Sequence, residues 1–296
     1  MPRPAALKAP LRRLAPLVGL LALLALGCED SVVPAGDAGR PFTLYAVLDP
    51  TEDRQALRLA TFRSGLDAAA DAEVDAEVIS TDLNTGEVVA WTDSLVAFGE
   101  GRFGHVFHAD FRPVYGHTYR VEARRSDGAV SSAEVTVPPL VEPLPLEAVR
   151  SGTVVLPTLW PGAPELNEPQ VTYVVEAPDC EVRAVTLPAS RPAEPFEFGW
   201  RVETDLLADA EAVFEALAPA TSLGLIAVRV GAHVASANWY PPGGTFDPEV
   251  LVDPNAFTNV RNGFGFVGAG YVLSVPVRIE PTYRSQAGFR APSPGC

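Results

Sequence analysis

The sequence predicts an all-β fold, and three observations predict it. Short runs rich in Val, Leu, Phe, Tyr and Thr recur from residue 41 onward, with turn residues between them at roughly the 8–12-residue spacing of β-sandwiches. The run at residues 72–81 has a period of two over most of its length, which is the pattern of a strand with one buried face. The 29 prolines and 24 glycines favour many turns. We therefore expect strands joined by short loops, with little helix.

The first part of the predicted fold is a sandwich over residues 41–139. Residues 74–80 alternate small or apolar side chains with mainly acidic ones, so one face is expected in the core. Asp127-Gly128 lies between two such runs and predicts a tight hairpin. Seven strands in about a hundred residues predict an immunoglobulin-like or transthyretin-like sandwich. The strands are expected at residues 42–48, 55–62, 72–81, 88–94, 102–110, 118–125 and 129–137.

A second β-rich domain is predicted over residues 140–296. Residues 137–145 contain four prolines, which cannot donate hydrogen bonds to a sheet, so the domain boundary is placed there. One short helix is expected at residues 206–217, where apolar side chains share one face and Thr204 or Asp205 can cap the N-terminus. Further strands are expected at residues 170–177, 181–187, 196–203, 224–233 and 270–279.

The N-terminus has the layout of a cleaved export signal. Four positive charges precede an apolar run over residues 14–26, and the small residue Gly27 follows it. The run is shorter than the ~20 residues that a membrane-spanning helix needs, and acidic residues come soon after it. We therefore expect residues 1–27 to be a signal peptide.

Cys28 is the expected site of lipid attachment. Residues 25–28 (Ala-Leu-Gly-Cys) resemble the bacterial lipobox, in which the cysteine thiol is acylated. Acyl chains give a stable anchor, because each buried CH₂ contributes roughly 0.8 kcal/mol. Residues 28–40 are polar and rich in Gly, Pro and Ala, which predicts a flexible tether. The alternative is ordinary signal cleavage that leaves a free Cys28. A lipid anchor predicts a location in the cell envelope.

The chain is acidic, with 22 Lys and Arg against 37 Asp and Glu. Removal of residues 1–27 takes away four positive and no negative charges, which moves the formal charge from −15 to −19. A surface of this sign repels nucleic acid and anionic lipid headgroups, so we expect no nucleic-acid partner. Lys8 is the only lysine, so every cationic side chain of the mature part, histidine aside, is arginine.

Cys180 and Cys296 remain once Cys28 is assigned to lipid. An oxidising envelope compartment permits a disulfide between them. Spacing typical of a zinc site, such as C-x-x-C, is absent from the sequence. The pair is therefore a candidate disulfide, and the sequence does not decide whether the bridge forms.

The segment 263–268 (Gly-Phe-Gly-Phe-Val-Gly) matches the glycine pattern of dinucleotide binding. That chemistry requires a strand before the glycines and a helix N-terminus after them. Residues 271–275 instead have the composition of a strand. We expect the glycines to serve backbone geometry, with Phe264 and Phe266 packing inward, and we expect no cofactor.

The histidines and the acidic residues do not have the spacing of metal ligands. His105 and His108 are three residues apart in a predicted strand, so they face opposite sides and cannot share one metal. The acidic residues between 67 and 77 lack the Gly and Glu spacing of a calcium loop. Charged side chains at a strand edge also prevent mispairing, so a solvated edge explains them. We expect no metal site.

The candidate contact with a ligand or partner is the pair Trp239 and Tyr240. These aromatic residues lead into a proline-glycine loop, and exposed Trp and Tyr suit sugar or protein contacts. Burial at the end of a strand explains the pair equally well. No G-x-S-x-G elbow is present, so the sequence predicts no catalytic residue.

A resemblance to a known family rests on several short motifs. They are Cys28 with its tether, the opening strand 42–48, Gly116-His117-Thr118-Tyr119, the exit at 131–138 and residues 262–268. The chain resembles the Bacteroidetes-type lipoproteins that carry domain of unknown function 4249 (DUF4249). The resemblance implies an immunoglobulin-like N-terminal part, an outer-membrane location and association with TonB-dependent receptors. Val267-Gly268 departs from the family's aromatic-Gly-Ala ending.

The leading hypothesis from the sequence is a non-enzymatic surface lipoprotein. It would be held to the membrane by its N-terminal lipid and would bind a nutrient polymer or an outer-membrane receptor through its β-sandwich loops. The alternative is a cell-envelope hydrolase or a polymer-binding protein whose site the sequence does not reveal. A deep cleft with convergent carboxylates would favour the enzyme, and a shallow patch would favour the binding protein.

Overall fold

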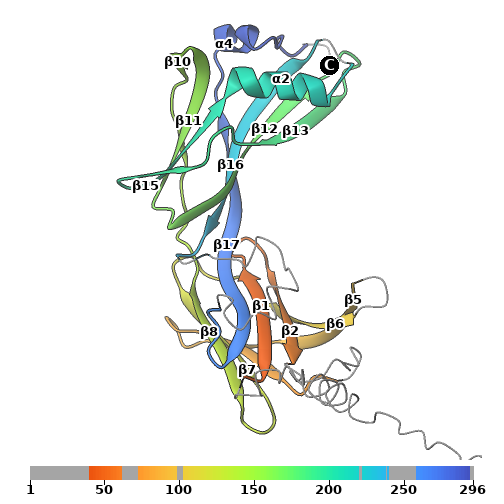
Figure 1. Ribbon diagram of the computed structural model, residues 1–296, viewed down its shortest axis with the longest axis vertical. Coiled ribbons are helices and arrows are strands. Elements are labelled where there is room, and N and C mark those ends of the chain that lie inside the picture. The colour runs from red at the N-terminus through yellow and green to blue at the C-terminus, as the bar shows by residue number, and fades with distance from the viewer. Residues whose placement is uncertain are drawn as a thin grey trace, which may run out of the picture. The chain divides into compact units, whose positions relative to one another are not determined.

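The computed structural model describes residues 40–61, 73–98, 103–219, 222–237, 239 and 258–293. The predicted signal peptide, Cys28 and the predicted tether up to residue 39 lie outside these ranges. Within them the chain consists of β-strands and two helices (Figure 1). The predicted all-β fold is confirmed.

The N-terminal domain contains eight strands where seven were predicted, and the strand predicted at residues 72–81 begins only at Glu77. The main difference is at Trp91, which divides the predicted strand 88–94 in two. Its side chain is 7% exposed and its Nε1 donates to Ser80 Oγ at 3.1 Å, so the chain turns inward there. The strands are β1 (Phe42–Leu48), β2 (Arg54–Thr61), β3 (Glu77–Asp82), β4 (Val88–Ala90), β5 (Thr92–Ala97), β6 (Phe103–Asp110), β7 (Thr118–Arg124) and β8 (Val130–Thr136).

The pairing of these strands is that of an immunoglobulin-like sandwich. One sheet has the order β1-β2-β6-β5 and the other β4-β3-β7-β8. With the eight strands lettered A, B, C, C′, D, E, F and G along the chain, these sheets are ABED and C′CFG. Of the two sandwich types predicted, the strand order selects the immunoglobulin-like one.

Tyr119 supplies a second mark of this fold. It lies near the start of β7, the strand equivalent to F, and its hydroxyl accepts a hydrogen bond from the Val114 backbone N–H at 3.0 Å. That geometry is the tyrosine corner of immunoglobulin-like sandwiches. Phe111 packs against both Tyr119 and Trp91, with ring centroids 5.9 Å apart in each pair. The corner thus joins the loop before β7 to the core.

The second domain is built from the remaining strands and the helices. β11 was not predicted from the sequence, because Pro157 and Pro161 fall within it and proline is unusual in strands. The elements are β9 (Leu144–Pro145), β10 (Val149–Ser151), β11 (Thr153–Pro161), β12 (Glu165–Glu176), β13 (Val182–Pro188), β14 (Glu194–Phe196), β15 (Gly199–Asp205), α2 (Leu206–Ala216), β16 (Gly224–Ala235), β17 (Gly263–Val277) and α4 (Pro281–Gln286).

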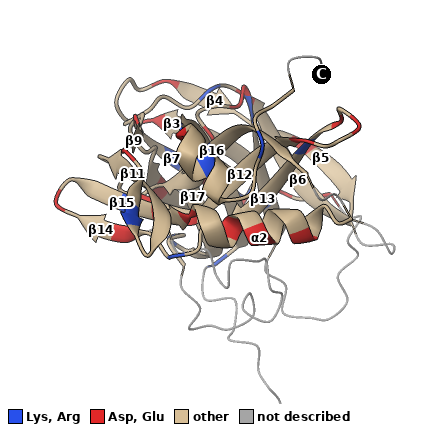
Figure 2. Ribbon diagram, turned by 90° about the horizontal axis from the view of Figure 1, so that it is seen from above, with Lys and Arg blue, Asp and Glu red and all other residues tan. Residues whose placement is uncertain are grey.

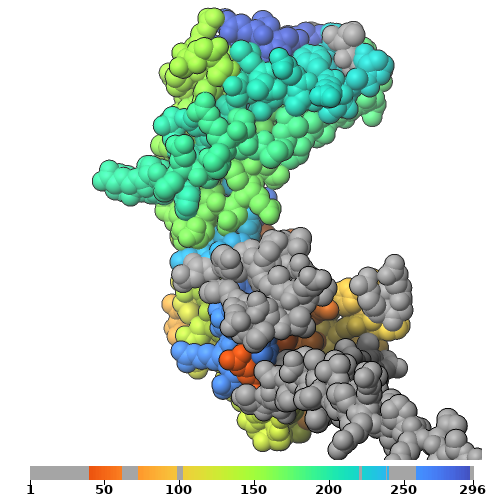
Figure 3. All heavy atoms as spheres, viewed as in Figure 1, coloured from red at the N-terminus to blue at the C-terminus, as the bar shows by residue number. Residues whose placement is uncertain are grey.

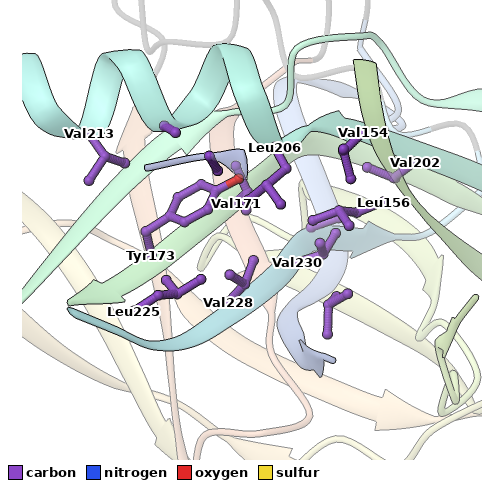
Figure 4. Packing of buried hydrophobic residues seen from close by; sticks show 14 of the residues in the cluster. Val154, Leu156, Val171, Tyr173, Val202, Leu206, Val213, Leu225, Val228 and Val230 are labelled. Carbon is purple, nitrogen blue, oxygen red and sulfur yellow. The ribbon is translucent and has the colours of Figure 1, made fainter. Parts of the chain in front are cut away.

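The core of the second domain lies between the β12–β16 part of the large sheet and the layer formed by β11, β15 and α2 (Figure 4). Figure 4 shows Leu206 and Val213 of α2 above Tyr173 of β12. The predicted helix is confirmed, and Asp205 caps it by accepting from the backbone N–H groups of Leu207 and Ala208. The short helix α4 is an addition to the one helix predicted.

β17 belongs to both domains, which corrects the predicted boundary. Its first half runs parallel to β1, with Phe42 opposite Gly263 and Leu48 opposite Ala269. Its second half runs antiparallel to β16. One sheet of eight strands, in the order β13-β12-β16-β17-β1-β2-β6-β5, therefore passes through both domains (Figure 1). The split at residue 139/140 was wrong for Val260, Val267 and Ala269, which pack in the N-terminal core.

The glycines of segment 263–268 lie in this shared strand, as the structural interpretation predicted. A Cβ at Gly265 would overlap the Leu44 carbonyl oxygen, and the φ of +98° favours glycine. The residues after the glycines continue as strand, so the helix that dinucleotide binding requires is not there. Phe266 is 5% exposed, as predicted. Phe264 is only half-buried, and the Arg40 guanidinium lies 4.8 Å above its ring centre.

Candidate functional site

The predicted contact pair Trp239 and Tyr240 is only half described, because Tyr240 and the loop after it lie outside the described residues. The Trp239 ring packs edge-on against two others, with centroids 4.7 Å from His233 and 5.4 Å from Phe266. It is half-buried rather than fully exposed. Burial lowers the pKa of His233, which favours the neutral ring in this cluster. A contact role for Trp239 stays a prediction.

The most exposed aromatic side chain in the described ranges is Phe198, at 66%. It lies at the turn between β14 and β15, and Figure 3 shows this hairpin projecting from the second domain. No motif in the surrounding sequence marks it as a contact residue. A lone exposed ring is common on protein surfaces, so Phe198 alone does not define a site.

Cys180 is disulfide-bonded, and its partner lies outside the described residues. The chain near the C-terminus runs close to the end of β12, four residues before Cys180. There Arg290 Nη1 lies 2.6 Å from Glu176 Oε1, and the Ser293 backbone N–H donates to the same carboxylate. The hydrogen bond from Arg290 is the main cause that lowers the pKa of Glu176. The pairing of Cys180 with Cys296 stays a prediction.

Two histidines pair with aspartates through Nδ1. His105 lies 2.7 Å from Asp93 Oδ2, and His117 lies 2.8 Å from Asp82 Oδ2. His105 and His108 fall on opposite faces of β6, as predicted. In the part of the chain that the structure describes, no group of three or more His, Cys, Asp or Glu is arranged to hold a metal ion.

The Asp82 carboxylate has a structural role. It also accepts from the backbone N–H groups of Asn84 and Thr85, which fixes the turn between β3 and β4. Burial raises the pKa of this group, but the hydrogen bonds outweigh burial and the net pKa is lowered. The pair with His117 therefore ties this turn to the segment before β7, next to the tyrosine corner.

One recess of about 430 Å³ lies on the outer face of the N-terminal domain. Asn259 fixes one wall, because its side-chain amide makes hydrogen bonds in both directions with the backbone of Val267, at 2.7 and 3.0 Å. Arg261 and Ser132 exchange backbone hydrogen bonds, which hold this wall beside β8. We call this the polar recess; it is lined by Arg120, Glu122, Ser132, Ala133, Glu134, Asn259 and Arg261.

A second recess, of about 420 Å³, lies in the second domain where β17 ends. Beyond Val277 the chain no longer pairs with β16 and continues into α4. The recess lies where the two segments part. The register of β12 against β16 shifts near Ile226, which is 44% exposed. We call this the aliphatic recess; it is lined by residues 225–228, residues 276–279 and Arg284.

Unpaired arginines distinguish both recesses from the rest of the surface. Carboxylates outnumber cations, and Figure 2 shows acidic positions along α2 among others. Most described arginines accordingly pair with a carboxylate, as Arg120 does with Glu134 at 2.8 Å. In the described ranges, the arginines whose side chains have no carboxylate, hydroxyl or aromatic partner are Arg150, Arg261, Arg278 and Arg284.

Three of these four line the recesses, Arg261 the polar one and the other two the aliphatic one. The sequence did not reveal them, because some arginines pair with a carboxylate two residues away, as Arg183 does with Glu181, whereas others pair across the fold, as Arg290 does with Glu176. The shortage of cations in the sequence was the signal that could have directed attention to single arginines. An uncompensated guanidinium in a recess suits an anionic group.

Asp209 is a buried carboxyl inside the second core and belongs to neither recess. It is 5% exposed and accepts a hydrogen bond from the Tyr173 hydroxyl at 2.8 Å. Burial, together with the charge of Asp205, raises the pKa of Asp209 to about 6, although the Tyr173 hydrogen bond opposes the change. Burial also raises the pKa of Tyr173 well above its usual range. Burial and Asp205 therefore favour the protonated Asp209, whereas the Tyr173 hydrogen bond favours its ionised form.

Replacing Asp209 with asparagine is expected to stabilise the protein at neutral pH. The folded-state pKa lies above that of the unfolded chain, so the stability due to this group is complete below about pH 4 and is lost as pH rises through about 6. A shift of roughly two units corresponds to on the order of 3 kcal/mol. Urea unfolding should give Asp209→Asn a higher free energy of unfolding than the wild type at pH 7, and this difference should be much smaller at pH 4.5.

Asp209→Ala is the control for that comparison, because alanine removes the acceptor of Tyr173 as well as the charge. We expect it to be less stable than Asp209→Asn at both pH values. A difference between the asparagine variant and the wild type that did not change with pH would contradict the raised pKa.

Comparison with known proteins does not identify a relative of this chain. No family model and no curated protein matches the chain. Among solved structures, the crystal structure of bovine butyrophilin matches at 15% identity with a TM-score of 0.19, over 81% of this chain and 100% of the butyrophilin chain. A TM-score this low carries no argument, so the class of the N-terminal domain rests on its strand order and tyrosine corner. In the described ranges no helix is long and apolar enough to cross a membrane.

Proposed function

We propose that this protein is a non-enzymatic lipoprotein of the outer membrane that binds a protein partner through its immunoglobulin-like domain. Its lipid on Cys28 anchors the domain, and residues 28–40 give it reach from the membrane surface. The partner is an outer-membrane receptor, such as a TonB-dependent one. Support for the anchor comes from the lipobox-like sequence, and support for the binding role comes from the polar recess.

The observation that carries the binding role is the unpaired Arg261 in the polar recess. The lining presents both signs of charge on paired strands, with Arg120 and Glu134 held together across β7 and β8. Arginine is enriched at protein interfaces, where its planar group makes several hydrogen bonds at once. A sugar polymer would be bound by exposed aromatic rings, and the lining has none. These features favour a carboxylate on a protein partner.

The test is affinity capture of the tagged, lipid-anchored protein from native membranes, followed by quantitative mass spectrometry. We expect an outer-membrane protein to co-purify with the wild type. The captured amount should fall about tenfold or more with Arg261→Glu, because the glutamate would face the partner's carboxylate. Arg150→Glu is the matched control, since Arg150 is also exposed and unpaired but lies on β10.

Two outcomes would contradict the proposal. One is the absence of any enriched outer-membrane protein in the wild-type sample. The other is capture of the same protein at the same level by Arg261→Glu and by Arg150→Glu, which would remove the polar recess from the interface.

A further inference from the structure

The aliphatic recess combines an apolar lining with two uncompensated charges. Residues 225–228 of β16 and residues 276–279 contribute only Leu, Ile, Ala, Val and Pro side chains apart from Arg278. Arg284 of α4 completes the lining. No carboxyl, amide or hydroxyl side chain takes part. The recess therefore offers apolar contact and cationic hydrogen-bond donors, and nothing else from its side chains.

Arg284 is held in place without a partner for its charge. Its backbone N–H donates to the Glu280 carbonyl at 3.0 Å, and its own carbonyl accepts from Phe289 N–H at 3.1 Å. Its Nε is enclosed by protein with no hydrogen-bond partner in the described part of the chain. Glu280 lies one helical turn before Arg284, and in the described part of the chain it forms no ion pair with Arg284. A half-buried guanidinium left in this state is stabilised by an incoming anion.

We propose that the aliphatic recess binds an aliphatic monocarboxylate, a molecule of the fatty-acid type. The hydrocarbon chain lies along Ile226 and its neighbours, and the carboxylate meets Arg278 and Arg284. A volume of about 420 Å³ lies within the range of small-molecule sites. A peptide is a poorer fit, because its amide groups would lack partners among aliphatic side chains. A phosphate or other small polar anion would leave the apolar wall unused.

The test uses the lipid-anchored protein in a nonionic detergent and octanoate as the probe, with binding measured by isothermal titration calorimetry. We expect octanoate to bind and octanol, which has the same chain without the charge, to bind at least about tenfold more weakly. Arg284→Gln and Arg278→Gln should each lower the affinity for octanoate by about tenfold. Arg150→Gln should leave the affinity unchanged, because Arg150 is unpaired but lies outside the recess.

Ile226→Glu tests the apolar wall. It also keeps the proposal testable if Arg284→Gln does not fold. The position is 44% exposed, so the fold should tolerate glutamate, while the added charge faces the bound carboxylate. We expect octanoate binding to be lost with an unchanged circular dichroism spectrum. Equal binding of octanol and octanoate would overturn the proposal. So would stronger binding of N-acetyl-valyl-leucine than of octanoate, which would make the recess a peptide site.

This site does not depend on the proposed partner in the outer membrane. Loss of the captured protein in Arg261→Glu with normal octanoate binding would support both proposals separately. Failure of octanoate binding would leave the polar recess unaffected.

Discussion

Replacing Gly265 with alanine is expected to destabilise the protein by at least about 3 kcal/mol. The residue has a φ of +98°, which costs a residue with a Cβ roughly 1–3 kcal/mol. The new methyl group would also overlap the carbonyl oxygen of Leu44, the residue opposite in β1, and overpacking adds about 1–3 kcal/mol. The three nearest atoms all belong to the Leu44 backbone, so no side chain can move to relieve the clash. Thermal unfolding should shift down by roughly 10 °C.

Gly128→Ala is the matched control for this prediction. Gly128 also has a positive φ, of 89°, but a Cβ there would meet nothing within 4 Å. The control should therefore show only the conformational cost, roughly 1 kcal/mol. Equal losses in the two variants would contradict the close approach of β17 to β1.

The same measurements test the alternative of nucleotide binding at residues 263–268. A bound nucleotide at about 100 times its dissociation constant would add roughly 2.7 kcal/mol to the free energy of unfolding. That increase would raise the melting temperature by several degrees. We expect no shift of the wild type with NAD or ATP, because these glycines lie within a paired strand. A clear shift that disappears in Gly265→Ala would restore the nucleotide interpretation.

Replacing Cys28 with serine is expected to abolish lipid attachment completely. A serine hydroxyl does not replace the thiol that receives the acyl groups, so the chain should keep residues 1–27 and carry no lipid. Metabolic labelling with a fatty-acid analogue, read by gel fluorescence, measures the attachment. The size of the band reports signal processing in the same experiment.

Cys296→Ser is the control for that labelling experiment. It should keep the lipid label, because Cys296 is predicted to form a disulfide and not to carry lipid. Mass spectrometry of the nonreduced wild type should in addition find Cys180 linked to Cys296. Label that persists on the Cys28→Ser protein would rule out the lipid anchor at this position.

The sequence by itself determined the local structure of this protein. Composition and the spacing of turn residues located most strands, and period-two alternation supported the one at residues 72–81. Asp205 could be named as a helix cap from the residues that follow it, since capping depends only on neighbouring backbone N–H groups. Residues 271–275 favoured strand over helix, which was enough to argue against a dinucleotide fingerprint.

The tertiary structure alone decided which distant segments meet. No local pattern shows that β17 pairs with β1, and only this pairing explains why a Cβ is excluded at Gly265. The same pairing carries Val267 into the N-terminal core, across a boundary drawn from prolines. The unpaired arginines of the two recesses could be recognised only once the folded chain showed which arginines pair with a carboxylate. Long-range pairing depends on the packing of the whole chain, whereas strands, turns and caps depend on a few neighbouring residues.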